Sequence, residues 1–307
     1  MNDWSCPLCD SVEKRYLFTT YDAMHAVDRP FAVVCCEQCH LYSLCPRPQE
    51  DELLSLYPED YEPFWEPIET DPHPIRRWFR KRHFNYRRRI VYQAQPAGGT
   101  LLDIGCATGG FVKETCRNPN WQGAGVDINT RALQIARQQG VAALCNDTNL
   151  LGFPSESFDV VTLWEVIEHL PDPRQTLIEI HRVLKPGGRL ILSTPNGASW
   201  PAHLLHKYWC SWEVPRHLQV FTPTTLAHLF QETGFGSTRR VVVPMERFVL
   251  MESARRWINE RWNGWRHRIG YAIVSMGGLA AWPLLHLADY MPSASSLVIE
   301  AHRIENV

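Results

Sequence analysis

Two pairs of cysteines near the N-terminus have the spacing of metal ligands. Cys6 and Cys9 form one C-x-x-C motif, and Cys36 and Cys39 form a second. Each motif can direct two thiolates at one ion, and the chain between them is long enough to return as a hairpin. Four sulfur ligands leave no open position, so the motifs predict a structural zinc site that does no chemistry. Cys35 is an alternative to Cys36, but only Cys36 gives the second motif its two-residue gap.

A second group of ligand-type side chains follows an apolar run in the middle of the chain. Glu165, Glu168 and His169 occupy positions i, i+3 and i+4 directly after the predicted strand 158–164. One helical turn there would place all three on one face, at the carboxyl end of the sheet. The alternative is that Glu168 and His169 only cap the loop before Pro171.

An apolar run that leads into small residues predicts a ligand-binding turn. Residues 101–111 read LLDIGCATGGF, which is typical of a buried strand that turns sharply into a helix. Gly105, Ala107 and Gly110 also fit a dinucleotide-binding pattern with its middle glycine replaced. The next predicted strand ends at Asp127, whose carboxylate can accept hydrogen bonds from both hydroxyls of a ribose.

The order of motifs along residues 97–246 resembles that of class I S-adenosylmethionine-dependent methyltransferases. The turn at 103–109, Asp127, the pair Asn146-Asp147, the strand 158–164 and the K-P-G-G turn at 185–188 follow one another as in that family. A nicotinamide-binding domain does not show the K-P-G-G turn. The resemblance implies an α/β fold, a Rossmann-like seven-stranded sheet with helices on both sides.

The same resemblance implies how S-adenosylmethionine would bind. Gly105 and Gly109 would line its methionine end. Asp127 would hold the ribose, Ile128 would pack on the adenine, and Asp147 would contact the adenine amino group. Ala107 replaces the family's middle glycine, and its methyl group narrows the approach to the backbone. The predicted cofactor-binding residues are Asp103, Gly105, Ala107, Gly109, Asp127, Ile128, Asp147 and Trp164.

The Glu-x-x-Glu-His cluster is similar to one that binds a divalent metal in ubiquinone-pathway O-methyltransferases and small-RNA 2'-O-methyltransferases. In the small-RNA enzymes a further histidine precedes a Phe/Trp-Thr stretch, and His217 before Phe221-Thr222 is similar. The resemblance implies a catalytic divalent metal. Its predicted ligands, which are also the predicted catalytic residues, are Glu165, Glu168, His169 and His217.

A segment rich in aromatic and polar side chains lies between the predicted fifth strand and a predicted helix at 224–233. Sugars stack on aromatic faces and hydrogen-bond to polar groups, so this segment is the predicted acceptor wall, and core packing is the alternative. The predicted substrate residues are Asn196, Trp209, Trp212 and Arg216. The cysteine-rich head, the methyltransferase core and the V-P-R-H motif at 214–217 together resemble bacterial methyltransferases of surface glycans and deoxysugars.

Composition sets limits on location and partners. The chain has 307 residues, 45% hydrophobic and 21% charged, and its formal net charge of -2 argues against a general nucleic-acid binder. The N-terminal residues lack the basic and apolar regions of a secretion signal, so we expect a cytoplasmic protein. In that compartment the ten cysteines indicate metal ligands and core thiols, not disulfides.

Two segments outside the predicted core have a composition suited to surfaces. Residues 74–92 combine eight cationic side chains with aromatic ones, which predicts a helix with a solvated face or a phosphate site. Residues 269–288 contain no Asp, Glu, Lys or Arg. A membrane span there would separate the predicted last strand, 297–303, from its antiparallel partner, 239–245. We therefore expect an interfacial hairpin or an apolar lid, with peripheral membrane contact on the inner face through 250–290.

The sequence thus predicts a three-part chain with one activity. The parts are a zinc-ribbon-like domain at 1–60, a linker and basic helix at 61–96, and a methyltransferase domain at 97–307 with an apolar insertion at 247–296. The predicted activity is O-methylation of a sugar hydroxyl on a cell-surface glycan or a lipid-linked saccharide. Alternatives are C-methylation of a nucleotide-linked deoxysugar, RNA 2'-O-methylation, and a noncatalytic cofactor-binding scaffold.

Overall fold

The computed structural model divides the chain into two compact units, each assembled from segments that are distant in sequence. The head unit comprises Met1–Tyr57, Thr194–Leu226 and Val242–Leu297, and the sheet unit comprises Pro58–Ser193, Ala227–Val241 and Val298–Val307. These boundaries differ from the predicted three-part division, because the N-terminal segment shares its unit with two later segments. The structure describes residues 4–24, 27–57, 72–145, 150, 152–242, 246–262, 264–280, 282–291 and 293–304.

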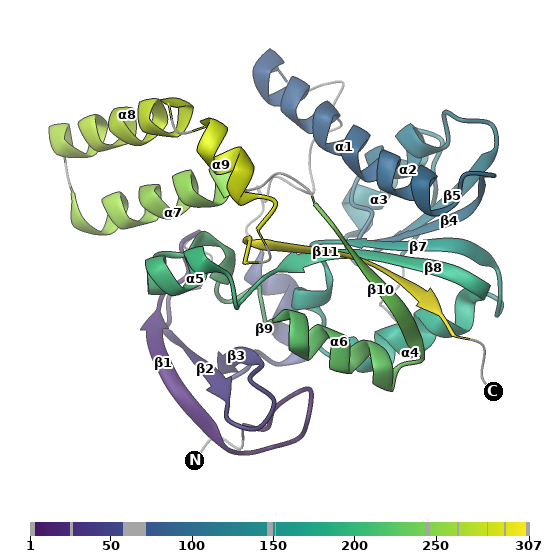
Figure 1. Cartoon of the computed structure of the whole chain (residues 1–307), viewed down its shortest axis with the longest axis horizontal. Coiled ribbons are helices and arrows are strands. Elements are labelled where there is room, and N and C mark those ends of the chain that lie inside the picture. Colours follow the sequence, from purple (N-terminus) through teal and green to yellow (C-terminus); the bar gives the residue numbers. More distant parts are fainter. Residues whose placement is uncertain are drawn as a thin grey trace. The chain divides into compact units, whose positions relative to one another are not determined.

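The sheet unit is built on seven strands in the order β10-β11-β8-β7-β4-β5-β6 (Figure 1). Strands β4 to β8 pair in parallel, whereas β10 pairs antiparallel with β11. Leu101, Val161 and Leu163 are fully buried, as expected for parallel strands covered on both faces. The predicted Rossmann-like sheet is confirmed. Its strands are β4 Gly99–Ile104, β5 Trp121–Asp127, β6 Ala142–Cys145, β7 Phe158–Trp164, β8 Leu184–Pro195, β10 Phe235–Val241 and β11 Ser296–Arg303.

Helices cover the sheet, and α3 and α4 begin at residues whose side chains cap them. The side chain of Asn129 accepts a hydrogen bond from Ala132 N at the start of α3, and Asp172 caps α4 ahead of Pro173. Figure 1 shows α2 and α3 on one side of the sheet and α4 on the other. The helices are α1 Pro74–Ala94, α2 Gly110–Thr115, α3 Thr130–Gln138, α4 Pro173–Val183 and α6 Pro223–Glu232, with a 3-10 turn, η4, at Ile167–His169.

The head unit contains a four-stranded sheet in the order β1-β2-β3-β9. Its strands are β1 Lys14–Thr20, β2 Phe31–Cys36, β3 Tyr42–Cys45 and β9 Gln219–Val220, so the last strand comes from a much later part of the chain. Phe31, Leu44 and Trp209 form part of a hydrophobic core below this sheet. The head unit also contains short helical elements, namely η1 Glu50–Leu56, α5 Trp200–Leu205, η5 His206–Tyr208 and η6 Cys210–Trp212.

The predicted insertion is helical. It contains α7 Glu246–Arg261, α8 Gly264–Ala280 and α9 Trp282–Ala288. Helices α7 and α8 pack against each other, with Trp262 beside Gly270 and Met251 beside Gly278. The charge-free run 269–288 is divided between α8 and α9, and no helix in the described part of the chain is long and apolar enough to span a bilayer.

Candidate active site

The turn after β4 consists of residues in the left-handed region of backbone space. Gly105, Ala107 and Gly109 have φ angles of 73°, 47° and 74°. Glycine adopts this region freely, whereas alanine is strained there. Ala107, which replaces the family's middle glycine, therefore occupies a position where the backbone conformation favours glycine. A Cβ on Gly105 would lie 2.5 Å from Val166 Cγ2, which leaves room only for glycine. The turn therefore keeps a bare backbone at the carboxyl end of β4.

Asp127 secures this turn and remains able to bind a ligand. Its Oδ2 accepts a hydrogen bond from Ala107 N at 2.8 Å, and its Oδ1 accepts one from Asn129 N at 2.8 Å. Burial raises the pKa of the Asp127 carboxyl, although the backbone amides oppose this shift. Each carboxylate oxygen has a second acceptor site, which suits two ribose hydroxyls. The adjacent Ile128 is 41% exposed and offers an apolar surface for a flat base, while Asp147 lies outside the described residues.

Arg87 is a candidate site residue that the sequence analysis counted only among the cationic residues of 74–92. Its guanidinium carbon lies 4.9 Å above the ring of Trp164. Burial lowers the pKa of Arg87 to about 10, against the opposing charges of Asp103 and Glu165. Within the described part of the chain, its buried Nε has no hydrogen-bond partner. A buried cation with donor capacity suits the carboxylate of an amino acid. The sequence could have indicated this position, because Arg87 follows Phe84 by three residues and so lies on the aromatic side of α1.

Asp103 and Trp164 form a wall behind the turn. Thr162 Oγ1 donates a hydrogen bond to Asp103 Oδ1 at 2.6 Å. Burial raises the pKa of Asp103 to about 7, while the Thr162 bond and the Arg87 charge act in the opposite direction. Trp164 packs edge-on against Phe111 with ring centroids 5.6 Å apart. Both residues thus support the turn and Arg87 from the sheet side.

The acidic cluster after β7 differs from the predicted single helical face. The turn η4 covers only Ile167–His169, and Glu165 precedes it with a φ of 58°. The amide of Glu165 donates to both the carbonyl and the hydroxyl of Ser193, which holds it in extension of β7. Glu168 is fully buried, whereas Glu165 and His169 are half-buried. The one-face prediction is wrong because Glu165 itself adopts a left-handed backbone and lies outside the turn.

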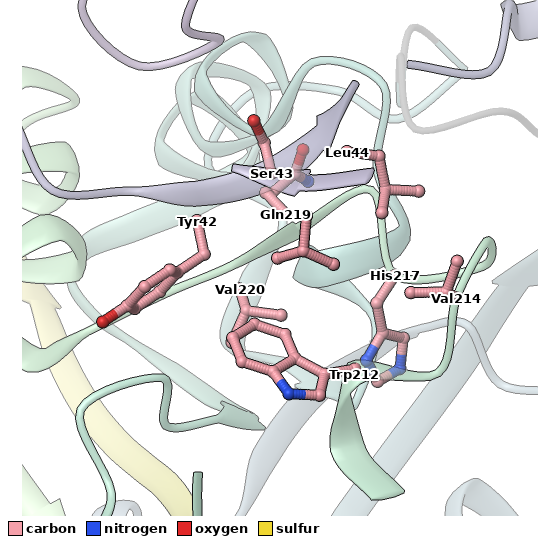
Figure 2. Close-up of a pocket in the computed structure, with 9 residues that line it drawn as sticks. Tyr42, Ser43, Leu44, Trp212, Val214, His217, Gln219 and Val220 are labelled. Atoms are coloured by element: carbon pink, nitrogen blue, oxygen red, sulfur yellow. The ribbon is translucent and has the colours of Figure 1, made fainter. Parts of the chain in front are cut away.

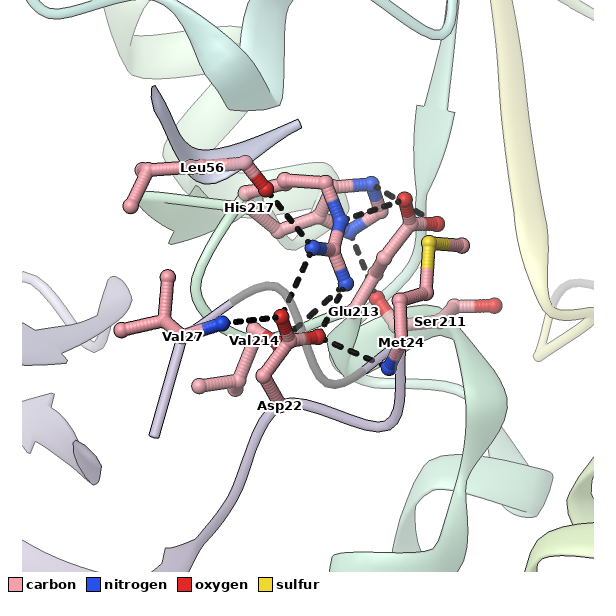
Figure 3. Close-up of polar contacts among 9 residues, drawn as sticks. Asp22, Met24, Val27, Leu56, Ser211, Glu213, Val214 and His217 are labelled. Atoms are coloured by element: carbon pink, nitrogen blue, oxygen red, sulfur yellow. Dashed lines mark hydrogen bonds and ion pairs between the residues drawn. The ribbon is translucent and has the colours of Figure 1, made fainter. Parts of the chain in front are cut away.

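His217, in the head unit, has a defined tautomer. Its Nδ1 donates a hydrogen bond to Ser211 O at 2.8 Å, because a carbonyl oxygen only accepts, so Nδ1 carries a proton (Figure 3). Nε2 lies 3.8 Å from Oε2 of Glu213, which precedes His217 by four residues in the turn that follows η6. This arrangement can take up a proton or contribute to a metal site. Glu213 was not among the predicted site residues, although its i, i+4 spacing to His217 was visible.

Arg216 is bound inside the head unit and does not face a substrate. Its guanidinium forms a two-point ion pair with Asp22, at 2.6 Å from Nη2 to Oδ1 and 3.2 Å from Nη1 to Oδ2 (Figure 3). Nη1 also donates to Leu56 O, and Nε donates to Glu213 Oε1. Both side chains of the pair are 0% exposed. The predicted substrate role gives way to a structural one, since Arg216 fixes the loop that carries His217.

The other predicted acceptor contacts are buried too. Trp209 and Trp212 are 0% and 5% exposed and belong to the hydrophobic core of the head unit. The Asn196 amide donates to Ala294 O at 2.8 Å and its oxygen accepts from Ala198 N, so its polar atoms hold a turn. A small cavity beside β3 and β9 is lined by Trp212 and His217 (Figure 2). It has room for about one water molecule, which excludes a sugar.

The four predicted cysteines converge in the head unit. The Sγ atoms of Cys6 and Cys39 are 3.4 Å apart, and those of Cys9 and Cys36 are 3.6 Å apart. All four sulfurs lie within 4.8 Å of one another, which suits tetrahedral coordination of one ion. Cys35 instead directs its Sγ to Cys36 O. Cys36, which was predicted as a ligand in preference to Cys35, therefore completes the cluster.

Replacement of Cys36 by serine should remove one zinc ion per chain, because a serine hydroxyl is a poor replacement for a thiolate ligand. Elemental analysis of the purified variant measures this directly. The matched control is Cys35→Ser, which should keep its zinc. Retention of zinc in Cys36→Ser together with its loss in Cys35→Ser would contradict the assignment.

A sequence model described as a methyltransferase domain matches residues 75–238, more than half of the chain. The chain belongs to the methyltransferase domain family. Within this family, the domain is of the class I S-adenosylmethionine-dependent type, as the strand order and the turn after β4 indicate. The Cys cluster and the helical insertion lie outside the elements that define this methyltransferase fold.

The methyltransferase has curated relatives over part of its length. It is 37% identical over 114 residues to a ubiquinone biosynthesis O-methyltransferase of Pseudomonas paraeruginosa, covering 35% of this chain and 49% of that protein. The protein of the same name from Coxiella burnetii is 31% identical over 113 residues, with 35% and 48% covered. The chain thus matches about half the length of these curated relatives.

Solved structures support the methyltransferase fold. Phosphoethanolamine N-methyltransferase 2 of Haemonchus contortus, solved with S-adenosyl-L-methionine, superimposes with a TM-score of 0.50 at 20% identity, covering 72% of this chain and 53% of that one. The cyclase SpnF gives the same TM-score and identity, with 72% and 81% covered. Because a cyclase shares the fold, the fold alone does not select a reaction.

Proposed function

We propose that the chain is an S-adenosylmethionine-dependent methyltransferase that methylates a hydroxyl oxygen. The observation that carries the proposal is the imidazole of His217, whose Nδ1 donates to Ser211 O and whose Nε2 lies 3.8 Å from Glu213 Oε2, an arrangement suited to a general base. The acceptor oxygen attacks the methyl carbon while its proton moves to Nε2. The carbon–sulfur bond breaks, and S-adenosylhomocysteine leaves. The O-methyltransferase names of the curated relatives support oxygen as the methylated atom.

The sheet unit offers groups for each part of S-adenosylmethionine. In this proposal Asp127 accepts from the ribose, Ile128 packs on the adenine, and Arg87 binds the methionine carboxylate. The turn 105–109 lies along the methionine end, as its bare backbone suggests. Asp147 keeps its predicted role at the adenine, outside the described residues.

Arg87→Met should weaken the binding of S-adenosylhomocysteine by about 10- to 100-fold, the usual effect of losing a charge-assisted hydrogen bond. Titration calorimetry measures the dissociation constant without any turnover. Arg89→Met is the matched control, because Arg89 is exposed on the same helix. Equal affinities of the two variants would remove Arg87 from the cofactor site.

The proposed acceptor is a sugar hydroxyl of a cell-surface glycan or of a lipid-linked saccharide. Support comes from the cysteine cluster and the V-P-R-H motif, which lie in one unit and together resemble glycan and deoxysugar methyltransferases. Because Asn196, Trp209, Trp212 and Arg216 are buried, other side chains would contact the sugar. A catalytic metal at Glu165, Glu168, His169 and His217 stays a prediction, and the chelation experiment below tests it.

Methyl transfer to defined acceptors tests the proposed function. The protein is given S-adenosylmethionine with an isotopically labelled methyl group and, separately, a lipid-linked saccharide, a nucleotide-linked deoxysugar and a short RNA. We expect mass spectrometry to find the label on a sugar oxygen of the saccharide. Label on a deoxysugar carbon or on an RNA ribose would select an alternative. Cofactor binding without transfer to these acceptors or to a cell extract would favour the scaffold.

A further inference from the structure

We infer that helices α8 and α9 of the insertion form a docking surface for an anionic lipid bilayer. Ile269, Ile273 and Met276 of α8 are 48%, 56% and 63% exposed. Their spacing of four and three residues places them on one face of the helix. These side chains give α8 an apolar stripe directed to solvent, where a helix of a soluble protein usually presents polar groups.

Helix α9 and the residues after it continue the apolar character. Leu284 and Leu287 are 72% and 66% exposed, one helical turn apart, and Tyr290 and Met291 follow at 61% and 47%. A protein keeps so many large apolar side chains in water at a cost, and their concentration in one segment marks an interaction site. We call the exposed side chains of Ile269, Ile273, Met276, Leu284 and Leu287 the insertion face.

The insertion face is distinct from the face that packs within the unit. On α8, Gly270 lies against Ile258 of α7 and Trp262 just after it, and Gly278 lies against Met251 of α7. The Tyr271 hydroxyl also donates to Asn259 Oδ1 on α7 at 2.9 Å. Because α7 already covers this side of α8, the packing of these two helices does not require the exposed apolar side chains.

Charge favours anionic lipid as the occupant. Residues 264–288 include two arginines and no Asp, Glu or Lys. Asp289, which follows α9, is buried and accepts a hydrogen bond from Glu246 N, so its carboxylate is not presented with the insertion face. An apolar surface with two arginines and no acidic residue along 264–288 matches the headgroup region of an anionic bilayer. Since no described helix can span the bilayer, the contact is made along the surface.

Vesicle co-sedimentation of the full chain tests this inference. The protein should sediment with vesicles of phosphatidylcholine and phosphatidylglycerol, and less with phosphatidylcholine alone or at high salt. The double variant Ile273→Ser/Met276→Ser should weaken binding at least tenfold. Ile178→Ser, which changes an exposed isoleucine on α4, should bind like the unchanged protein. Unchanged far-ultraviolet circular dichroism of both variants shows that they are folded.

Three results would overturn the inference. The first is failure of the intact protein to sediment with phosphatidylglycerol vesicles. The second is a double variant that binds as well as its control. The third is a dimer in analytical ultracentrifugation that the double variant dissociates, because a second copy would then cover the insertion face. The assay uses neither cofactor nor acceptor, so its outcome is independent of the proposed methyl transfer.

Discussion

Replacement of Asp22 by asparagine should lower the free energy of unfolding of the head unit by about 3–5 kcal/mol. The substitution keeps the shape of the side chain but removes the fully buried one of the two carboxylates paired with Arg216, so that Glu213 must balance the buried guanidinium. Both members of this pair are 0% exposed, so water cannot replace the lost interaction. Urea denaturation followed by circular dichroism measures the change.

An exposed ion pair in the same unit provides the control. Arg29 and Glu52 lie 3.1 Å apart with side chains 43% and 42% exposed. Glu52→Gln should leave the denaturation midpoint nearly unchanged, because solvent screens such a pair. The double variant Asp22→Leu/Arg216→Met should recover much of the loss, since it removes both buried charges. An Asp22→Asn midpoint equal to that of Glu52→Gln would show that the buried pair contributes little.

Replacement of His217 by alanine should reduce turnover by about 100- to 10,000-fold, the usual contribution of a positioned acid–base group. Binding of S-adenosylhomocysteine should remain, because the proposed cofactor contacts belong to the sheet unit. The matched control is His228→Ala on α6. His228 also has a glutamate four positions away, Glu232 at 3.5 Å, but His228 is exposed. Initial rates with the acceptor that the labelling experiment identifies measure the effect.

Chelation separates the two roles open to His217. If a divalent metal bound by Glu165, Glu168, His169 and His217 activates the acceptor, a mild chelator should abolish turnover reversibly, and Glu168→Ala should do the same. The zinc content of the cysteine cluster must stay constant during the treatment. Full activity in the chelator, with none in His217→Ala, would leave His217 as a base without a metal. Full activity in both would exclude His217 from catalysis.

The parallel strands of the sheet unit could be predicted because their signal is local, whereas β10 at Phe235–Val241 begins four residues before the predicted strand 239–245. The predicted strand 158–164 coincides with β7, since a parallel strand buried on both faces shows a continuous apolar run. The C-x-x-C motifs were equally informative, because their spacing alone restricts the geometry of the thiolates. The place of Asp127 at the end of β5 could be predicted for a similar reason, because an acidic residue ends an apolar strand there.

The acceptor side could not be predicted because its packing depends on distant residues. Arg216 and its partner Asp22 are 194 positions apart, and a pattern within one segment cannot show such a pair. Trp209 and Trp212 are of a type that serves binding surfaces and cores alike, and only the fold buries them. The backbone of Glu165 adopts a left-handed φ that its sequence gives no reason to expect.

The pairing of β3 with β9 limits how this chain can be recombined. Tyr42 and Ser43 pair with Val220 and Gln219, so one edge of the N-terminal sheet is closed by the loop that also carries His217. A chimera that exchanged only residues 1–57 with a relative would join mismatched edges and separate Asp22 from Arg216. A chimera must therefore transfer the two segments 1–57 and 194–226 together. Engineered transplants of the cysteine-containing segment will need to move both.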